Sequence, residues 1–511
     1  MFSSSTNFVE KLLATFDIDC QLELTSCERQ LVNNSRVVKA HDIFCAVQGT
    51  VNNGSLYIQQ AIDNGCDLII AECQTIAEHG QLIKVKGKTN TRLQLSFYQL
   101  NAKLFELSQG FYCRPNTALT MIGITGTNGK TTTSQLIAEL LNACQYSCAV
   151  IGTNGAGSIA NLMPLDNTTP AATHLHQLLH DFTTEKYDAV AMEVSSHALV
   201  QNRVKAELFD IAIFTNLTRD HLDYHQTMAK YGQAKYQLFS HDGEQIAVLN
   251  GDDKQAQEWL AVWPENQQVL VYGKTTNINQ YQQFLQATAI TYHSNGVSFT
   301  LITDKGQASI NSPLLGEFNI DNLLAAIAVL IIRGIQLDKI ASIIAFLPAI
   351  AGRMECFNAD NIATAIVDYA HTPDALKNAL LACRHHCQGK LWVVFGCGGD
   401  RDQGKRAQMG RIAEQYSDHV IITNDNPRSE SPIAISNDIL SGCEQPEKVT
   451  VLLTRQQAVI NTLTKALAND LVLLAGKGHE DYIIDGSNRI PYNERQLVRS
   501  HYAPFNNEVK I

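Results

Sequence analysis

The chain has 511 residues, 13 cysteines and a formal net charge of −11, and 45% of its residues are hydrophobic. This length indicates about three domains, and the composition argues against extended disorder. The absence of long Lys/Arg runs argues against nucleic acid as the main partner. We also expect no signal peptide and no membrane span, and the odd, scattered cysteines favour the reducing cytoplasm.

Three segments follow one another along the chain. Residues 1–115 combine short helices with apolar, strand-like runs such as DIFCAV and DLIIAE. Residues 116–350 contain the runs ALTMIGITG, DAVAMEVSS, DIAIFTNLT and QIAVLN, then predicted hairpins over 286–312 with SNG as a turn, and a helix over 319–335. Residues 351–511 alternate again, with TAIVDYA, KLWVVFGCGG, HVIITND, VTVLLT and DLVLLAGKG. This alternation predicts an α/β fold with mostly parallel sheets covered by helices.

Polar, Gly-rich stretches follow the predicted strands in the second and third segments. They are GTNGKTT, EVSSH, TNLTRDH, DYAHTPD, GCGGDRD, NDNPR and GKGHED. In open α/β sheets, ligands bind at the carboxyl ends of the strands. So many stretches of this kind in two domains predict a site in the cleft between them.

The stretch GITGTNGKTTTSQLIAELL joins a strand end, a Gly-rich turn and the start of a helix. Gly126 and Gly129 allow a tight turn, and the N–H groups of such a turn favour phosphate. Lys130 would reach the outer phosphates, and the Thr131 hydroxyl is a ligand type for Mg²⁺. Position 124 is Ile, so the standard P-loop spacing is absent. We nevertheless expect a nucleotide site rather than a plain strand-to-helix turn.

Two polar stretches downstream are candidates for holding a metal ion. Glu193 ends the strand AVAMEV, and His197 follows one helical turn later. A carboxylate beside serine hydroxyls suits a hard cation. A strand end capped by Ser195 and Ser196 explains the same spacing equally well. The second stretch, TNLTRDHLDYH, is dense enough in polar residues to indicate a functional loop; it contains Asp220, His221, Asp223 and His225.

Taken in chain order, these motifs resemble those of the Mur ligases. GTNGKTT, EVSSH, TNLTRDHLDYH, YGQAKYQLF, GEFNIDNLLAA, GRME, DYAHTPD, GCGGDRDQGKR, DNPR and GKGHEDY occur in the order found in that family. The chain resembles in particular the MurE-type branch, which adds meso-diaminopimelate to UDP-N-acetylmuramoyl-L-alanyl-D-glutamate. The resemblance implies a cytoplasmic, monomeric, ATP-dependent ligase of peptidoglycan precursor synthesis that works through an acyl phosphate.

The resemblance also implies three domains with separate tasks. Residues 1–115 would form a small mixed α/β domain that binds the UDP sugar. Residues 116–350 would form a central, P-loop-like ATPase domain with a mostly parallel sheet. Residues 351–511 would form a Rossmann-like domain that binds the incoming amino acid.

The residues for ATP and Mg²⁺ follow from the matching motifs. The implied ATP contacts are Gly126, Thr127, Asn128, Gly129, Lys130, Thr131, Thr132, Asn319, Arg353 and Asp368. The implied metal ligands are Thr131, Glu193, His197 and Lys235, the last as a carbamate. The implied catalytic residues are Lys130, Lys235, His221 and Arg353. Without the resemblance, Lys235 is only a charge on an amphipathic helix. A carbamate would convert its cation into an anion able to hold Mg²⁺.

The UDP-muramoyl dipeptide would lie against residues of the first two domains. The implied contacts are Asn33, Ser35, Thr50, Val51, Asn52, Asn167, Thr168, Thr169, Ser195, Gln201 and Arg203. The first domain departs from the family pattern twice. Asn34 stands where the family has the Asp of DSR, and Asn53 stands where it has the Asp of an Asp-Gly pair. Each departure removes one carboxylate.

The stretch DNPR resembles the family's recognition motif for meso-diaminopimelate. The implied contacts are Arg401, Asp425, Asn426, Pro427, Arg428, Gly476 and Glu480. The far end of this substrate carries an ammonium and a carboxylate. Asp425 can accept from the ammonium, and Arg428 can bind the carboxylate through a bidentate fork. Taken alone, the same residues are typical of a solvated turn.

Two other functions are compatible with parts of the pattern. A sibling ligase could add lysine, but Arg428 argues against a substrate that lacks the distal carboxylate. A nucleotide-driven switch or motor would also need the phosphate loop. The nonstandard loop spacing and the paired charges of DNPR argue against it, whereas ATP hydrolysis without any amino acid would favour it.

Overall fold

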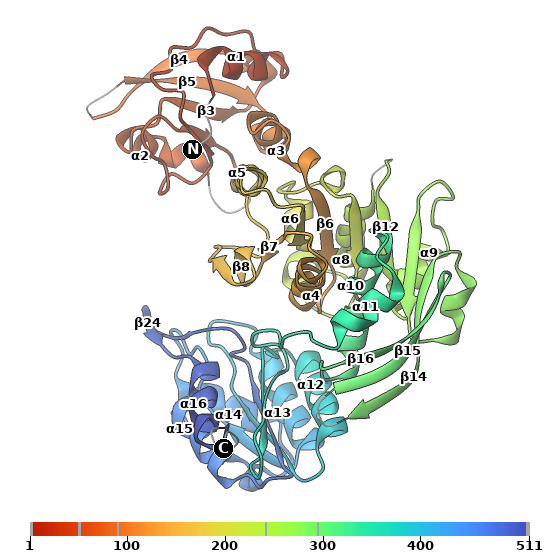
Figure 1. The fold of residues 1–511 in the computed structure, drawn as a ribbon. Helices are drawn as coiled ribbons and strands as arrows, with labels where there is room; N and C mark the ends of the chain where they lie inside the picture. Colours follow the sequence, from red (N-terminus) through yellow and green to blue (C-terminus); the bar gives the residue numbers. More distant parts are fainter. Residues whose placement is uncertain (1–3, 50–52, 89–90, 241–242, 294–295, 507–511) are drawn as a thin grey trace. The chain divides into compact units, whose positions relative to one another are not determined.

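The computed structural model describes residues 4–49, 53–88, 91–240, 243–293 and 296–506 (Figure 1). Two compact units make up the chain. The first contains residues 1–134, 141–249 and 253–269, and the second contains residues 135–140, 250–252 and 270–511. Mostly parallel strands occur in all three segments that the sequence delimits, which confirms the predicted α/β class.

The N-terminal segment of the first unit contains a five-stranded sheet. Its strands pair in the order β1 (Leu31–Val32), β2 (Ile43–Ala46), β3 (Leu68–Cys73), β5 (Thr91–Tyr98) and β4 (Leu82–Lys86). All pairs are parallel except β4 with β5. The helices of this segment are α1 (Thr6–Ala14), α2 (Ile58–Asp63) and α3 (Leu100–Phe111). Ser5 caps α1 by accepting a hydrogen bond from the N–H of Phe8.

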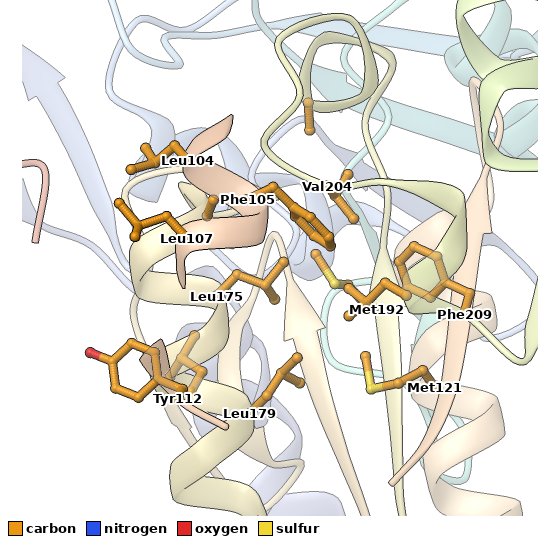
Figure 2. Packing of buried hydrophobic residues seen from close by; sticks show 14 of the residues in the cluster. Leu104, Phe105, Leu107, Tyr112, Met121, Leu175, Leu179, Met192, Val204 and Phe209 are labelled. Carbon is orange, nitrogen blue, oxygen red and sulfur yellow. The ribbon is translucent and has the colours of Figure 1, made fainter. Parts of the chain in front are cut away.

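An apolar contact joins this segment to the next within the first unit. Figure 2 shows three side chains of α3 beside two side chains of α5 (Ala172–Thr184), and all five belong to one buried core; they are Leu104, Phe105, Leu107, Leu175 and Leu179. The same core includes Met121 and Met192, which lie on neighbouring strands. Burial of apolar surface therefore stabilises the attachment of the N-terminal segment to its neighbour.

The strands that precede the predicted site loops are parallel and central in the first unit. The order is β12 (Ile246–Asn250), β11 (Ile211–Phe214), β6 (Thr120–Thr125), β10 (Ala189–Glu193) and β7 (Cys148–Gly152). These pairs are all parallel, and β8 (Gly155–Ser158) and β9 (Asn161–Met163) extend the sheet in antiparallel fashion. The apolar runs predicted as strands are confirmed. Parallel pairing places the ends of β6, β10 and β11 at one sheet edge.

The part of the middle segment that lies in the second unit is mainly antiparallel. β13 (Val269–Gly273) pairs in parallel with β14 (Phe284–His293), which pairs with β15 (Gly296–Thr303), and β15 pairs with β16 (Gly306–Ser312). The hairpins predicted over 286–312 are confirmed, although two residues of the SNG turn lie outside the described residues. The predicted closing helix is α10 (Glu317–Ile332), and α11 (Leu337–Ile344) follows it.

The C-terminal segment forms a six-stranded sheet with helices on both faces. Its order is β17 (Glu355–Phe357), β18 (Thr364–Asp368), β22 (Leu471–Ala475), β19 (Leu391–Phe395), β20 (His419–Ile422) and β21 (Thr450–Val451), and only β17 is antiparallel. One core packs α12 (Pro373–His386), α13 (Gly404–Tyr416) and α14 (Pro432–Leu440) against the sheet. Another packs α15 (Arg455–Lys465) and α16 (Glu494–Asn506). A hairpin of β23 (Tyr482–Asp485) and β24 (Asn488–Pro491) follows β22.

Within the described part of the chain, none of the helices combines the length and the apolar character that crossing a membrane requires.

Candidate active site

The loop after β6 has the backbone geometry of a phosphate-binding turn. It joins Thr125 to α4 (Lys130–Ala143), and φ is +153° at Gly126 and +88° at Gly129. A Cβ atom on Gly126 would lie 1.8 Å from Thr215 Oγ1, so only glycine allows so close an approach. The start of α4 therefore faces the turn, where helix N–H groups attract an anion.

Lys130 bends back over this loop. Its Nζ donates to the carbonyl oxygens of Gly126 at 2.9 Å and Thr127 at 3.0 Å. The loop is also held to the end of β11, because the Asn128 N–H donates to Asn216 Oδ1 at 2.9 Å. An ammonium group is thus held at the turn itself. It can exchange neutral carbonyl partners for phosphate oxygens, which are stronger acceptors because they are charged.

Glu193 is the buried carboxylate of the site. It ends β10, its exposed fraction is 1%, and its Oε2 accepts from Thr131 Oγ1 at 3.0 Å. Thr153, which sequence reasoning missed, donates to the same carboxylate from its N–H at 2.9 Å and from its Oγ1 at 3.1 Å. A Cβ on Gly152 would lie 2.2 Å from Glu193 Oε1. A carboxylate and hydroxyls that meet beside the phosphate loop are oxygen ligands of the type that Mg²⁺ prefers.

His197 lies in a cluster of aromatic rings. Its ring centroid is 4.9 Å from that of His221, 5.3 Å from that of His225 and 4.3 Å from that of Tyr224. Burial lowers the pKa of His197 to about 4, and burial also lowers the pKa values of His221 and His225. Neutral imidazoles therefore predominate here near pH 7.

The contacts separate the predicted metal ligands into two groups. Thr131 contacts Glu193, whereas His197 contacts two other histidines. Among the described residues, no group of three or more His, Cys, Asp or Glu side chains is arranged to hold a metal ion. A cation bound by the described residues would therefore have fewer than three of these side chains as ligands.

Lys235 is buried at the phosphate loop. It lies in α8 (Met228–Tyr236), its exposed fraction is 1%, and its Nζ donates to Gly126 O at 2.8 Å. The same Nζ lies 4.4 Å from the centre of the Tyr231 ring. Burial, and then the charge of Lys130, lower the pKa of Lys235 well below its ordinary value. The interpretation of Lys235 as a surface charge on an amphipathic helix is therefore wrong.

The predicted dipeptide contacts of the middle segment gather around the end of β10. Thr169 Oγ1 donates to Glu193 O at 2.9 Å and accepts from the Ser195 N–H at 3.0 Å. Arg203 Nη1 donates to Thr169 O at 2.6 Å, and Gln201 Nε2 donates to the Tyr224 hydroxyl at 3.4 Å. These contacts bring Thr169, Ser195 and Arg203 into one network.

The remaining members of this set have simpler surroundings. Thr168 Oγ1 lies 3.1 Å from Thr153 Oγ1, and Asn167 is exposed. Ser195 caps α6 (Ser196–Val200) by accepting from the Ala198 N–H, as the capping interpretation predicts. Ser196 Oγ instead lies 2.9 Å from His225 Nε2. Capping by Ser195 does not exclude a metal-binding role for Glu193.

In the N-terminal segment, both departures from the family pattern keep a hydrogen-bond acceptor. Asn34 Oδ1 accepts from the Arg36 N–H at 3.1 Å, and Asn53 Oδ1 accepts from the Ser55 N–H at 3.0 Å. An aspartate would offer an oxygen at the same place, so the two turns do not depend on the lost charges.

The predicted uridine contacts of this segment are only partly described. Ser35 is buried and donates to Gln60 Oε1 at 2.8 Å, and Asn33 Oδ1 accepts from Thr173 Oγ1 at 2.9 Å. The predicted contacts at residues 50–52, namely Thr50, Val51 and Asn52, lie outside the described residues.

The other predicted nucleotide contacts lie in the second unit. Asn319 is buried in the first turn of α10, where its Nδ2 donates to Leu315 O at 2.7 Å. Asp368 ends β18 and accepts from the N–H of Met354 at 2.8 Å, and burial raises its pKa. The Arg353 guanidinium lies 4.7 Å from the centre of the Tyr369 ring. Arg353 and Asp368 thus belong to one local network.

The DNPR stretch is not a solvated turn. The exposed fractions of Asp425 and Asn426 are 7% and 5%, and Arg428 is half-buried. Arg428 adopts a left-handed backbone with φ +52°, and its N–H donates to Ile484 O at 3.0 Å. Its Nη1 donates to Gly399 O at 2.8 Å. The loop after β20 is therefore held by the loop after β19 and by the hairpin after β22.

The loop after β19 is bound to the DNPR loop by a row of polar contacts. The Gly399 N–H donates to Asn426 O at 2.9 Å, and Ser429 Oγ donates to Asp400 Oδ1 at 2.6 Å. Arg401 follows directly and is exposed, with its Nη1 donating to Asp400 O at 3.3 Å. Three predicted contacts, Arg401, Asn426 and Arg428, therefore lie on joined loops.

Gly476 allows the loop after β22 to approach Asp425. Its φ is +111°, and a Cβ there would lie 2.6 Å from Asp425 Oδ2. A buried ion pair supports both loops, since Arg455 Nε donates to Glu494 Oε2 at 2.6 Å. Arg455 also donates to Asn424 O at 3.3 Å and Ala475 O at 2.8 Å. The carboxylate of Asp425 is thereby directed toward the Gly476 backbone.

Lys477 is a charged residue of this region that sequence reasoning missed. Its exposed fraction is 0%, and its Nζ lies 3.2 Å from Asp425 Oδ1 and 3.1 Å from Glu480 Oε2. The only sequence signal was its position inside GKGHEDY. A lysine in a polar loop is usually a surface residue, so neither its burial nor its partners could be expected.

Comparison with known proteins agrees with this arrangement. Residues 124–330 match the Mur ligase middle domain, and residues 352–478 match the Mur ligase, glutamate ligase domain. A solved structure of UDP-N-acetylmuramoyl-L-alanyl-D-glutamate–2,6-diaminopimelate ligase is 32% identical, with a TM-score of 0.68 over 99% of this chain and 100% of that chain. The three-domain α/β architecture predicted from the sequence is confirmed by this match.

More distant structures share the fold. MurF from Acinetobacter baumannii is 18% identical, with a TM-score of 0.63 over 98% of both chains. MurF from Thermotoga maritima, solved in complex with ADP, is 20% identical, with a TM-score of 0.60 over 88% of this chain and 93% of that chain.

Proposed function

We propose that this chain, which belongs to the Mur ligase family, adds meso-diaminopimelate to UDP-N-acetylmuramoyl-L-alanyl-D-glutamate. Membership makes it an ATP-dependent ligase that forms amide bonds. The choice of amino acid rests on one observation, the buried Asp425 and half-buried Arg428 held on one loop. Asp425 offers a carboxylate for the ammonium at the far end of diaminopimelate, and Arg428 offers a guanidinium for the carboxylate there.

ATP would bind at the loop of Gly126 to Thr132. The positive φ values of Gly126 and Gly129, the N-terminus of α4 and the ammonium of Lys130 support this assignment. Asn319, Arg353 and Asp368 belong to the second unit and stay predicted nucleotide contacts. The fold shared with MurF from Thermotoga maritima, which was solved in complex with ADP, also supports a nucleotide site.

Thr131 and Glu193 fit a Mg²⁺ ion. They are oxygen donors 3.0 Å apart, and Glu193 is a buried carboxylate beside the phosphate loop. When bound, the ion would supply positive charge that neutralises phosphate oxygens. His197 is proposed as a further contact, and its low pKa keeps a nitrogen lone pair available.

Lys235 is proposed to carry a carbamate. Its amine is buried, and burial lowers its pKa, which favours the neutral form that attacks carbon dioxide. The amine nitrogen attacks the carbon of carbon dioxide, one C–O π bond breaks with its electron pair moving to oxygen, and the nitrogen gives one proton to water. The product is an anion near Gly126, and it would supply a further oxygen ligand.

Two displacements would complete the reaction. A carboxylate oxygen of the substrate attacks the γ-phosphorus of ATP, and ADP leaves. The amine of diaminopimelate then attacks the acyl carbon, phosphate leaves, and the nitrogen gives up a proton. Lys130 would neutralise the charge on the transferred group, and positioning would provide most of the rate. His221 is proposed to act at the same step by orienting the phosphate, and Arg353 of the second unit stays a predicted catalytic residue.

The UDP-linked substrate is proposed to lie against the end of β10 and the N-terminal segment. The network of Thr169, Ser195 and Arg203 supports this placement, since it offers hydroxyl and guanidinium donors beside Glu193. A cytoplasmic location and a monomeric state complete the proposal. The odd number and scatter of the 13 cysteines support the former.

The experiment is an amino-acid panel. Phosphate release is measured with ATP, Mg²⁺ and UDP-N-acetylmuramoyl-L-alanyl-D-glutamate, in the presence of meso-diaminopimelate, lysine, ornithine or no amino acid. We expect release only with meso-diaminopimelate, together with the UDP-muramoyl tripeptide by mass. Equal turnover with lysine would contradict the amino-acid assignment, and release without any amino acid would favour a nucleotide switch.

A further inference from the structure

We infer that Lys477 balances the charge of the amino-acid site and thereby sets its preference for a zwitterion over a cation. The inference rests on the proposed function and goes beyond it, because Lys477 would act on the substrate through Asp425 and Glu480. It is thus a positioning residue.

The ammonium of Lys477 is enclosed by oxygen atoms. Its Nζ donates to Asn426 Oδ1 at 2.8 Å and to Tyr482 O at 2.9 Å. It also forms ion pairs with Asp425 Oδ1 at 3.2 Å and Glu480 Oε2 at 3.1 Å. A fully buried ammonium persists only when charged partners compensate its lost hydration. Lys477 therefore belongs to the same electrostatic unit as the two carboxylates.

Lys477 also determines how neighbouring groups are directed. The Asn426 oxygen accepts from Lys477 and from the Ile484 N–H at 2.9 Å, so the Nδ2 of that amide donates to Glu480 Oε2 at 3.0 Å. The same ammonium faces Asp425 Oδ1, while Oδ2 faces Gly476. Thus the ammonium engages one oxygen of each carboxylate, while the other oxygen of Glu480, Oε1, accepts from the Tyr369 hydroxyl at 3.4 Å.

The charges in this unit cancel. Among its buried and half-buried side chains, Asp425 and Glu480 are negative, whereas Lys477 and Arg428 are positive; Arg401 is exposed and is not counted. The far end of meso-diaminopimelate is also neutral overall, with one ammonium and one carboxylate. The far end of lysine carries only the ammonium. A neutral site does not attract the lysine cation by its net charge. A site that lacks Lys477 would be negative and would attract that cation.

A purely structural role predicts something different. If Lys477 only braced the loop, its loss would disturb the site for both amino acids by the same factor. A role in charge balance predicts that the ratio of the two kcat/KM values changes, and that its direction depends on the sign of the charge removed. The ratio is therefore the quantity to measure.

The experiment compares Lys477→Met with Glu480→Gln, both in the full-length enzyme. We expect Lys477→Met to lower the ratio of kcat/KM for meso-diaminopimelate over lysine by at least ~10-fold, and Glu480→Gln to raise it. Lys465→Met, on the exposed end of α15, is the matched control and should leave the ratio unchanged.

The double variant Lys477→Met/Glu480→Gln removes one charge of each sign. We expect its ratio to return to within ~3-fold of wild type, although both kcat/KM values are lower. If Lys477→Met alone does not fold, the ratio in the double variant and the direction of the change in Glu480→Gln still test the charge-balance role. KM for ATP should stay constant in all variants.

Equal losses for both amino acids in Lys477→Met, or no rise of the ratio in Glu480→Gln, would overturn the inference and leave the proposed function intact. A wild-type enzyme that uses lysine as well as meso-diaminopimelate would overturn the proposed function first, and the inference with it.

Discussion

Removal of the Arg428 side chain isolates the contribution of one guanidinium to amino-acid choice. The loop would keep its shape in Arg428→Ala, because the backbone N–H still donates to Ile484 O. Arginine and alanine have a similar conformational energy cost in the left-handed region at a φ of +52°, so the substitution adds no backbone strain. The substitution removes one hydrogen bond within the protein, from Arg428 Nη1 to Gly399 O, and water can replace the lost donor.

The magnitude follows from the donors that remain for a substrate. One N–H of Nη1 is engaged by Gly399 O, which leaves the other donors of the half-buried fork for a carboxylate. Hydrogen bonds to charged groups contribute about 1.5–3 kcal/mol each. Two such bonds, partly screened by solvent, give about 3 kcal/mol, or roughly a 100-fold loss in kcat/KM. We expect most of the loss in KM.

The assay measures kcat/KM for meso-diaminopimelate and for lysine with wild type, Arg428→Ala and Arg428→Lys. Wild type should prefer meso-diaminopimelate by more than ~100-fold. In Arg428→Ala this preference should fall strongly, although lysine should remain a poor substrate. Arg428→Lys should recover little, since a point charge cannot reproduce the fork. Arg411→Ala, on the exposed face of α13, is the matched control.

Two results would refute this reasoning. One is a wild-type enzyme that uses lysine as well as meso-diaminopimelate. The other is an Arg428→Ala variant whose preference is unchanged. Either would mean that DNPR only shapes a buried loop.

Other parts of the molecule give four further expectations. Lys130→Ala should abolish phosphate release at saturating ATP without changing the circular dichroism spectrum, and near-normal turnover would remove the phosphate-loop assignment. Lys235→Ala should be nearly inactive, and short carboxylic acids but not bicarbonate should restore part of its activity; full activity of this variant would exclude Lys235 from the mechanism. Arg455→Met should lower the free energy of unfolding by about 3–5 kcal/mol, measured in urea, because it leaves the buried Glu494 carboxylate without its charged partner; a change below ~1 kcal/mol would contradict this. Burial lowers the pKa of His176 to about 4, so its neutral form stabilises the fold above pH ~6.5, and this contribution is lost as the pH falls toward 4. His176→Phe should therefore flatten the decline of Tm over that range, and an unchanged slope would argue against it.

Local sequence determined the phosphate loop and the strands around it. Apolar runs of strand length, each followed by a polar stretch, predicted β6, β10 and β11 and the edge at which they end. The glycines of GTNGKTT predicted a turn that only glycine can adopt, and Gly126 indeed has φ +153°. These features depend on neighbours in the chain, so periodicity and spacing are sufficient to find them.

The tertiary structure alone decided which charges are buried and which groups they contact. Lys235 belongs to a helix with an amphipathic pattern, yet its Nζ lies 2.8 Å from Gly126 O, 109 residues away in sequence. Lys477 reads as a loop lysine, yet it bridges Asp425 and Glu480. Burial of a charge is favourable only when distant segments supply compensating partners, and no local pattern records where those partners lie.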